Sequence, residues 1–163
     1  MTSNPRLALA AASLAATALV VALVERPAHA QAAKPLQVKE TNVEGVNAEV
    51  VEAVRKEGVL TIKIRYRNGG ASPAKVVFTN DGRDVDHYYV VAGSTKFLVL
   101  KDAKNVPLMN ALNSHGGLYA ELKPAGSFLF WAKYPAPPAD AKKVNVHTPL
   151  APPIEDVPLT ESK

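Results

Sequence analysis

Residues 127–159 read SFLFWAKYPAPPADAKKVNVHTPLAPPIEDVPL, and this stretch decides how we expect the chain to fold. Its first part alternates with period two, which is typical of a strand that is buried on one face only. One side carries Phe128, Phe130, Ala132 and Tyr134, and the other carries Leu129, Trp131 and Lys133. The prolines that follow cannot donate backbone hydrogen bonds, so we expect this strand to end near Tyr134.

Two further strand-like segments follow in the same stretch. A short alternation resumes at Val144 and Val146. Residues 154–159 form a candidate edge strand, because Pro158 is tolerated only where no neighbouring strand needs its missing N–H. The pattern indicates that the C-terminal stretch closes an all-β domain on strands that lie upstream.

The upstream sequence supplies those strands. Residues 59–67 show the clearest alternation: Leu60, Ile62 and Ile64 share one side and charged residues share the other, as in an antiparallel sheet with one wet face. Residues 43–54 precede them across a short turn. Their Ala and Glu content also permits a helix, but the alternation favours a strand and therefore a hairpin. Further short strands are expected at residues 74–79, 88–91, 95–100, 106–109 and 118–122. This regular spacing predicts an antiparallel β-sandwich of about 7–9 short strands.

Residues 68–73, with the sequence NGGASP, read as a loop between two of these strands. Its two adjacent glycines indicate backbone at positive φ, and Pro73 ends the loop.

The first thirty residues form a targeting segment rather than part of the fold. Arg6 begins it, an apolar run covers residues 7–24, and Ala28-His29-Ala30 matches the small-x-small rule for cleavage before Gln31. The alternative is an uncleaved signal helix that acts as an anchor, since the run is barely long enough to span a bilayer. Either way we expect a periplasmic or secreted protein, with no membrane contact except through this segment.

The rest of the chain divides into three parts in this interpretation. Residues 31–42 are polar and are expected to be a flexible lead-in. Residues 43–159 form the folded domain, and residues 160–163 form a tail.

Composition excludes several classes of function. The 163 residues carry a formal charge of +4, and the basic residues are scattered without interleaved aromatic residues, so we expect no nucleic acid binding. The chain has no cysteine, which excludes disulfides, thiolate metal sites and a cysteine nucleophile. It also lacks a Gly-x-Ser-x-Gly elbow, a Ser-x-x-Lys motif and a glycine-rich phosphate loop. We therefore expect no enzyme and no cofactor.

Several segments together resemble a known type of domain. They are the strand of residues 60–66 with the NGGASP loop, the segments YYVVAGSTKFLVL and KDAKNVPL, the turn LKPAGS, and FWAKYPAPP running to APPIEDVPL. In this combination the chain resembles a small immunoglobulin-like sandwich domain of exported bacterial proteins, which occurs alone or attached to OmpA-like envelope proteins. The resemblance implies an extracytoplasmic setting, a non-catalytic role in binding or envelope structure, and an envelope protein or cell-wall partner.

One loop is a candidate metal site. Asp81, Asp84, Asp86 and His87 lie within seven consecutive residues, and calcium favours carboxylate-rich loops. The spacing is not that of an EF-hand, and the alternative is a solvated turn with side-chain-to-backbone hydrogen bonds. His87, His115 and His147 lie on three separate segments, and no pair of them has the spacing of a zinc site.

Trp131 is the first candidate for a binding residue, together with Lys133 and Tyr119. If Phe130 and Tyr134 face the core, Trp131 points outward beside Lys133 and is able to anchor a partner. The interpretation that we favour is that residues 135–138 or the C-terminal strand cover it, because large exposed aromatic residues are rare without a partner.

Overall fold

The computed structural model describes residues 34–162, with the side chains of Arg83 and Asp84 left out of the description. The predicted signal segment, residues 1–30, lies outside the described residues. Residues 34–162 form eleven β-strands and one short 3-10 helix, with no α-helix, which confirms the all-β prediction. The elements are β1 (Gln37–Glu40), β2 (Val46–Lys56), β3 (Val59–Asn68), β4 (Ala74–Thr79), η1 (Arg83–His87), β5 (Tyr89–Ala92), β6 (Thr95–Leu98), β7 (Leu118–Leu122), β8 (Ser127–Pro135), β9 (Lys143–Thr148), β10 (Ala151–Pro158) and β11 (Thr160–Glu161).

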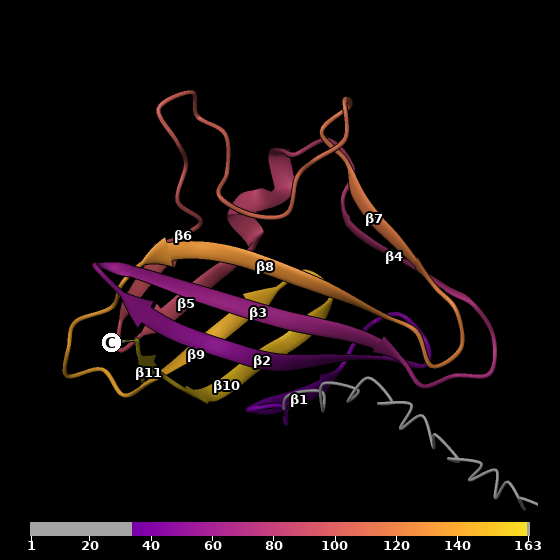
Figure 1. The fold of residues 1–163 in the computed structure, drawn as a ribbon, viewed down its shortest axis with the longest axis horizontal. Helices are drawn as coiled ribbons and strands as arrows, with labels where there is room; N and C mark the ends of the chain where they lie inside the picture. Colours follow the sequence, from indigo (N-terminus) through magenta and orange to yellow (C-terminus); the bar gives the residue numbers. More distant parts are fainter. Residues whose placement is uncertain (1–33, 163) are drawn as a thin grey trace, which may run out of the picture. The chain divides into compact units, whose positions relative to one another are not determined.

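The strands make two larger sheets and one strand pair. The five-stranded sheet has the order β1-β2-β3-β8, with β11 also paired to β2. The four-stranded sheet has the order β10-β9-β5-β6, and β4 pairs with β7. The pairings are antiparallel except that of β11 with β2. Figure 1 shows β3 between β2 and β8, with β5, β9 and β10 behind them.

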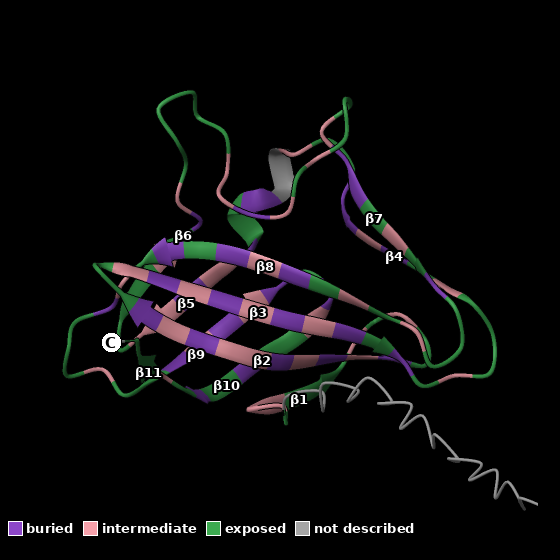
Figure 2. Ribbon diagram, in the orientation of Figure 1, coloured by how far each residue is buried: buried purple, intermediate pink, exposed green. Residues whose placement is uncertain are grey.

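Pairing of β3 with β8 sets the centre of the five-stranded sheet. The register runs without a shift from Val59 opposite Pro135 to Arg67 opposite Ser127. Residues Leu60, Ile62, Ile64, Phe130 and Tyr134 are all buried, as the alternation predicted. Figure 2 shows the result as alternating bands of buried and more exposed residues along β2, β3 and β8.

Aromatic side chains join β4 and the segment after η1 to this sheet. The ring of Phe78 on β4 stacks on Phe130 with 5.6 Å between ring centroids, and meets Tyr66 edge to face at 5.0 Å. Tyr88 stacks on Phe130 at 4.9 Å, and its hydroxyl donates a 2.7 Å hydrogen bond to the carbonyl oxygen of Phe78. Val146 and Ile154 from the four-stranded sheet belong to the same buried cluster. One core therefore takes residues from both larger sheets and from β4.

Positive φ angles occur in the hairpin turns rather than in the NGGASP loop. Glu57 and Gly58, with φ of 51° and 79°, form the turn between β2 and β3, and Gly93, with φ of 59°, begins the turn between β5 and β6. The prediction for Gly69 and Gly70 was wrong, since neither is among the residues with positive φ. A Cβ at Gly70 would lie 3.1 Å from the side-chain oxygen of Asn68, so close approach explains this glycine.

Both ends of the domain form strands that the sequence did not predict. β1 pairs with Asn47–Val50 of β2 and lies in the expected flexible lead-in, while β11 pairs with Val54 and Arg55 and lies in the expected tail. These two expectations were wrong, because β2 is longer than its partners and its outer edge offers backbone groups along its whole length. Conversely, residues 106–109 make only isolated bridges and no strand.

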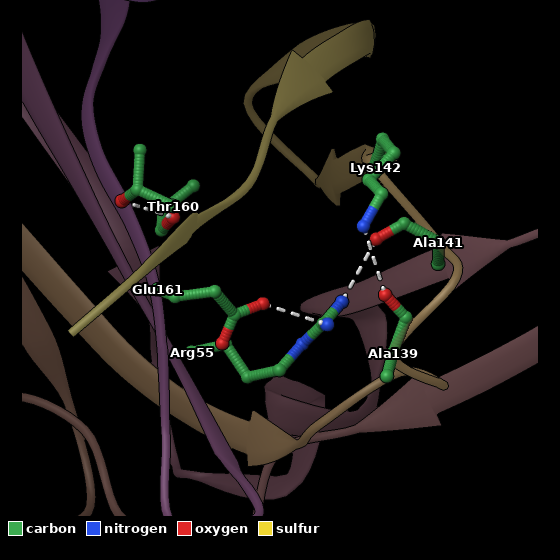
Figure 3. Close-up of polar contacts among 7 residues, drawn as sticks. Arg55, Ala139, Ala141, Lys142, Thr160 and Glu161 are labelled. Atoms are coloured by element: carbon green, nitrogen blue, oxygen red, sulfur yellow. Dashed lines mark hydrogen bonds and ion pairs between the residues drawn. The ribbon is translucent and has the colours of Figure 1, made fainter. Parts of the chain in front are cut away.

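A buried arginine secures the C-terminal end of the domain (Figure 3). The guanidinium of Arg55 donates a 2.8 Å hydrogen bond to the carboxylate of Glu161 and a 2.9 Å hydrogen bond to the carbonyl oxygen of Ala141. The backbone N–H of Ser162 also donates to the carbonyl oxygen of Arg55, at 3.0 Å. The segment after β10 is thereby attached to β2, and the charge of the buried Arg55 is compensated by Glu161, whose side chain is 65% exposed.

We expect Ile62→Ala to lower the free energy of unfolding by about 2–5 kcal/mol, the usual range for truncation of a buried isoleucine. Thr61→Ala, on the opposite side of the same strand, should cost about 1 kcal/mol or less. Urea denaturation of the domain measures both. Equal losses for the two variants would contradict the assignment of the buried side of β3.

Candidate binding surface

The outward side of β3 and β8 brings together two of the predicted binding residues. Trp131 lies opposite Lys63 in the β3–β8 register, and Lys133 lies opposite Thr61. Trp131 is half-buried and Leu129, one step along β8, is 47% exposed. We call this surface the Trp131 face and define it by Glu49, Glu52, Thr61, Lys63, Arg65, Arg67, Leu129, Trp131 and Lys133.

Two ion pairs cross from β2 to β3 beside the apolar residues. The carboxylate of Glu49 lies 2.6 Å from the guanidinium of Arg65, and the carboxylate of Glu52 lies 2.8 Å from the ammonium of Lys63. A bulge at Val51, between the two acidic residues, keeps both carboxylates on this side of the sheet. The pairs fix the long side chains along one side of Leu129 and Trp131.

The expected cover over Trp131 is not what the structure shows. A shallow depression at Trp131 is lined by Glu52, Thr61, Lys63 and Lys133, with no residue from 135–138 or from the C-terminal strand. The C-terminal strand β10 pairs instead with β9 in the four-stranded sheet. Trp131 is therefore flanked by two lysines and remains part of the surface.

Asn110 closes the outer edge of β8 next to Trp131. Its side-chain oxygen accepts a 2.7 Å hydrogen bond from the backbone N–H of Trp131, and its side-chain amide donates to the carbonyl oxygen of Leu129 at 3.2 Å. The backbone N–H of Lys133 donates to Leu108, and its carbonyl accepts from Leu100. The backbone of β8 is therefore already paired at this edge. Sequence reasoning missed this contact, because a single Asn in a loop carries no signal of its distant partner.

The edge strand expected at residues 154–159 is confirmed, but it is a poor template for another strand. β10 lies at one side of the four-stranded sheet, and its pairing with β9 shifts register twice. Pro152, Pro153 and Pro158 have no N–H to donate, and Asp156 adopts a φ of 55°. A partner that adds a strand would find few aligned backbone groups there.

The third predicted binding residue lies elsewhere. Tyr119 is 56% exposed on β7, which pairs with β4 and does not belong to the five-stranded sheet. The ammonium of Lys75 lies 5.3 Å from the centre of its ring. The structure thus groups Trp131 with Lys133 and separates Tyr119 from both.

The acidic loop contains η1, and one of its carboxylates contacts a lysine. Asp86 lies 3.6 Å from the ammonium of Lys101. Among the described side chains, no group of three or more His, Asp or Glu residues lies close enough to hold a metal ion. The side chain of Asp84 is outside the description, so the calcium hypothesis for Asp81, Asp84 and Asp86 stays a prediction. Ser114 and His115 come shortly before β7 in the sequence. The hydroxyl oxygen of Ser114 lies 3.3 Å from Nδ1 of His115, and both residues are exposed.

A second surface feature crosses the four-stranded sheet. The rings of His147 on β9 and Tyr89 on β5 stack at 4.3 Å, and the ammonium of Lys96 on β6 lies 3.9 Å from the centre of the Tyr89 ring. Partial burial lowers the pKa of His147, the charge of Lys96 lowers it further, and Glu155 on β10 opposes the shift. The sequence showed these residues but not the register that stacks them.

Comparisons with protein-family models, with curated proteins and with solved structures give no match to this chain. In residues 34–162 we find no helix with the length and apolar character needed to cross a membrane.

The lowered pKa of His147 predicts a pH dependence of stability. The imidazole of His147 binds a proton at higher pH in the unfolded chain than in the folded domain. Its contribution to the free energy of unfolding is therefore complete above about pH 6.5 and is lost as the pH falls through the pKa of the folded state. We expect the melting temperature to fall more steeply between about pH 7.5 and 5 in the native domain than in His147→Gln. Parallel curves for the two proteins would contradict the assigned direction.

Proposed function

We propose that this chain is an exported, non-catalytic module with an immunoglobulin-like sandwich fold, and that it binds a component of the cell envelope through the Trp131 face. The observation that carries the proposal is the position of Trp131. It lies with Leu129 on the outward side of the five-stranded sheet, between the ion pairs of β2 and β3 and the side chain of Lys133. No segment of the described chain crosses over the depression beside it.

The sandwich arrangement is supported by the shared core. The buried sides of the two larger sheets contribute to one cluster, with Ile62 and Phe130 from one sheet and Val146 and Ile154 from the other. Export is supported by the sequence of residues 1–30, with its apolar run and its Ala28-His29-Ala30 site.

Binding through a face, rather than an edge, is supported by how the edges of the five-stranded sheet and the β10 edge are built. β1 and β11 pair with β2, the segment around Asn110 pairs with β8, and prolines interrupt β10. An indole next to an aliphatic side chain, within a rim of charged residues, has the composition of an interface centre. The non-catalytic part of the proposal rests on the absence from the sequence of the motifs that supply a nucleophile or a phosphate loop.

Capture from envelope extracts tests the proposal. The native domain, Trp131→Ala and the matched control Tyr119→Ala are immobilised at equal density, and bound components are compared. We expect Trp131→Ala to lose a component that the native domain and Tyr119→Ala retain, with an affinity loss of about 30-fold or more, since an interface anchor costs at least about 2 kcal/mol on truncation. Identical sets for all three proteins would place Trp131 outside any binding site.

The export part of the proposal is tested in the same cells. N-terminal sequencing of the protein recovered from the periplasmic or extracellular fraction should show that it begins at Gln31. An intact Met1 in a cytoplasmic fraction would contradict export.

A further inference from the structure

Resting on the proposed function, we propose that the partner of the Trp131 face is a protein surface on which acidic residues flank an apolar patch. The inference starts from the charges of the face. Glu49 and Glu52 are both engaged, one with Arg65 and the other with Lys63. Arg67 and Lys133 are exposed, and neither makes an ion pair with any other side chain that the structure describes.

These two cations lie at opposite ends of the apolar pair. Arg67 is opposite Ser127, two residues before Leu129, and Lys133 follows Trp131 by two residues. The step from Ser127 to Lys133 along the strand corresponds to about 20 Å. A complementary partner therefore presents carboxylates about 20 Å apart, with an apolar side chain between them that contacts Leu129 and Trp131.

The ion pairs of β2 and β3 explain why the two remaining cations determine the chemistry of the partner. The two carboxylates of the face neutralise Arg65 and Lys63, so those side chains add little net attraction. Arg67 and Lys133 outnumber the one further carboxylate that the described strands place on this side of the sheet, that of Glu40 on β1, which shares a side with Arg67 through the residue of β2 that pairs with both. An acidic partner surface compensates the positive charge that remains. Both are exposed rim residues, whose charges mainly steer association and are sensitive to salt.

A protein fits this pattern better than a lipid surface or a glycan. An anionic membrane would press against Glu49 and Glu52 as well as against the cations, whereas a protein surface can place opposite charges beside each of them. A polar sugar has little to gain from Leu129, which is 47% exposed beside the indole. An aliphatic and an aromatic side chain side by side instead match the apolar centre of a protein interface.

Site-specific crosslinking tests the inference in the full chain. A photoreactive phenylalanine analogue replaces Leu129, cells that produce the protein are irradiated, and the crosslinked peptide is identified by mass spectrometry. We expect a protein peptide with Asp or Glu residues near the crosslink. Lys133→Glu and Arg67→Glu should each reduce the yield by about tenfold or more at low salt, because reversing a charge that steers association slows the formation of the complex.

Lys75→Glu is the matched control, because it makes the same change of charge on β4, outside the Trp131 face. It should leave the yield unchanged. An acidic residue of the identified partner changed to Lys should restore crosslinking to Lys133→Glu, which a loss of folding would not allow.

The outcomes separate this inference from the proposed function. Equal yields for Lys133→Glu, Arg67→Glu and Lys75→Glu would overturn the acidic partner but leave binding through the face intact. Crosslinks to a lipid, a glycan or a second copy of this chain would overturn it in the same way. The absence of any crosslink from position 129 would contradict the proposed function itself.

Discussion

The antiparallel pairing of β3 with β8 is the constraint on which the rest of the structure depends. Opposite residues of two paired strands share a side of the sheet, so one register assigns Ile62 and Ala132 to the core and Lys63 and Trp131 to the surface. A slip by one residue would exchange the two sets and place charged side chains in the core. Because apolar residues alternate along both strands, such a slip would lower the stability of the fold. The aromatic cluster of Phe78, Tyr88 and Phe130 would also be broken, which adds to the loss.

Unpaired strand edges impose the second constraint. The outer edge of β2 is shared by β1 and β11, which come from opposite ends of the domain, and the buried Arg55 attaches the second of them. The outer edge of β8 is closed by Asn110 and its neighbours. Since these edges are already paired, the sheet presents its outward side to other molecules. This arrangement supports the proposed binding role of that side.

Local pattern was enough to predict much of this fold. Alternation placed the strands around residues 59–67 and 128–134 and assigned the buried side of each correctly. It also placed Trp131 with Lys133, because residues two apart on one strand lie on the same side of the sheet. The contacts that the sequence did not reveal join distant residues: Asn110 with Trp131, Arg55 with Glu161, and Tyr89 with His147. Their pairing depends on sheet order, which no short segment encodes. The expected cover over Trp131 was wrong for the same reason, since β10 pairs with β9 in the other sheet.

Quenching of tryptophan fluorescence tests the position of Trp131 most directly, because Trp131 is the only tryptophan of the chain. The account predicts the emission of a partly hydrated indole that iodide quenches more strongly than caesium, since Lys63 and Lys133 flank the ring and attract anions. The emission of a buried indole, quenched by neither ion, would contradict it.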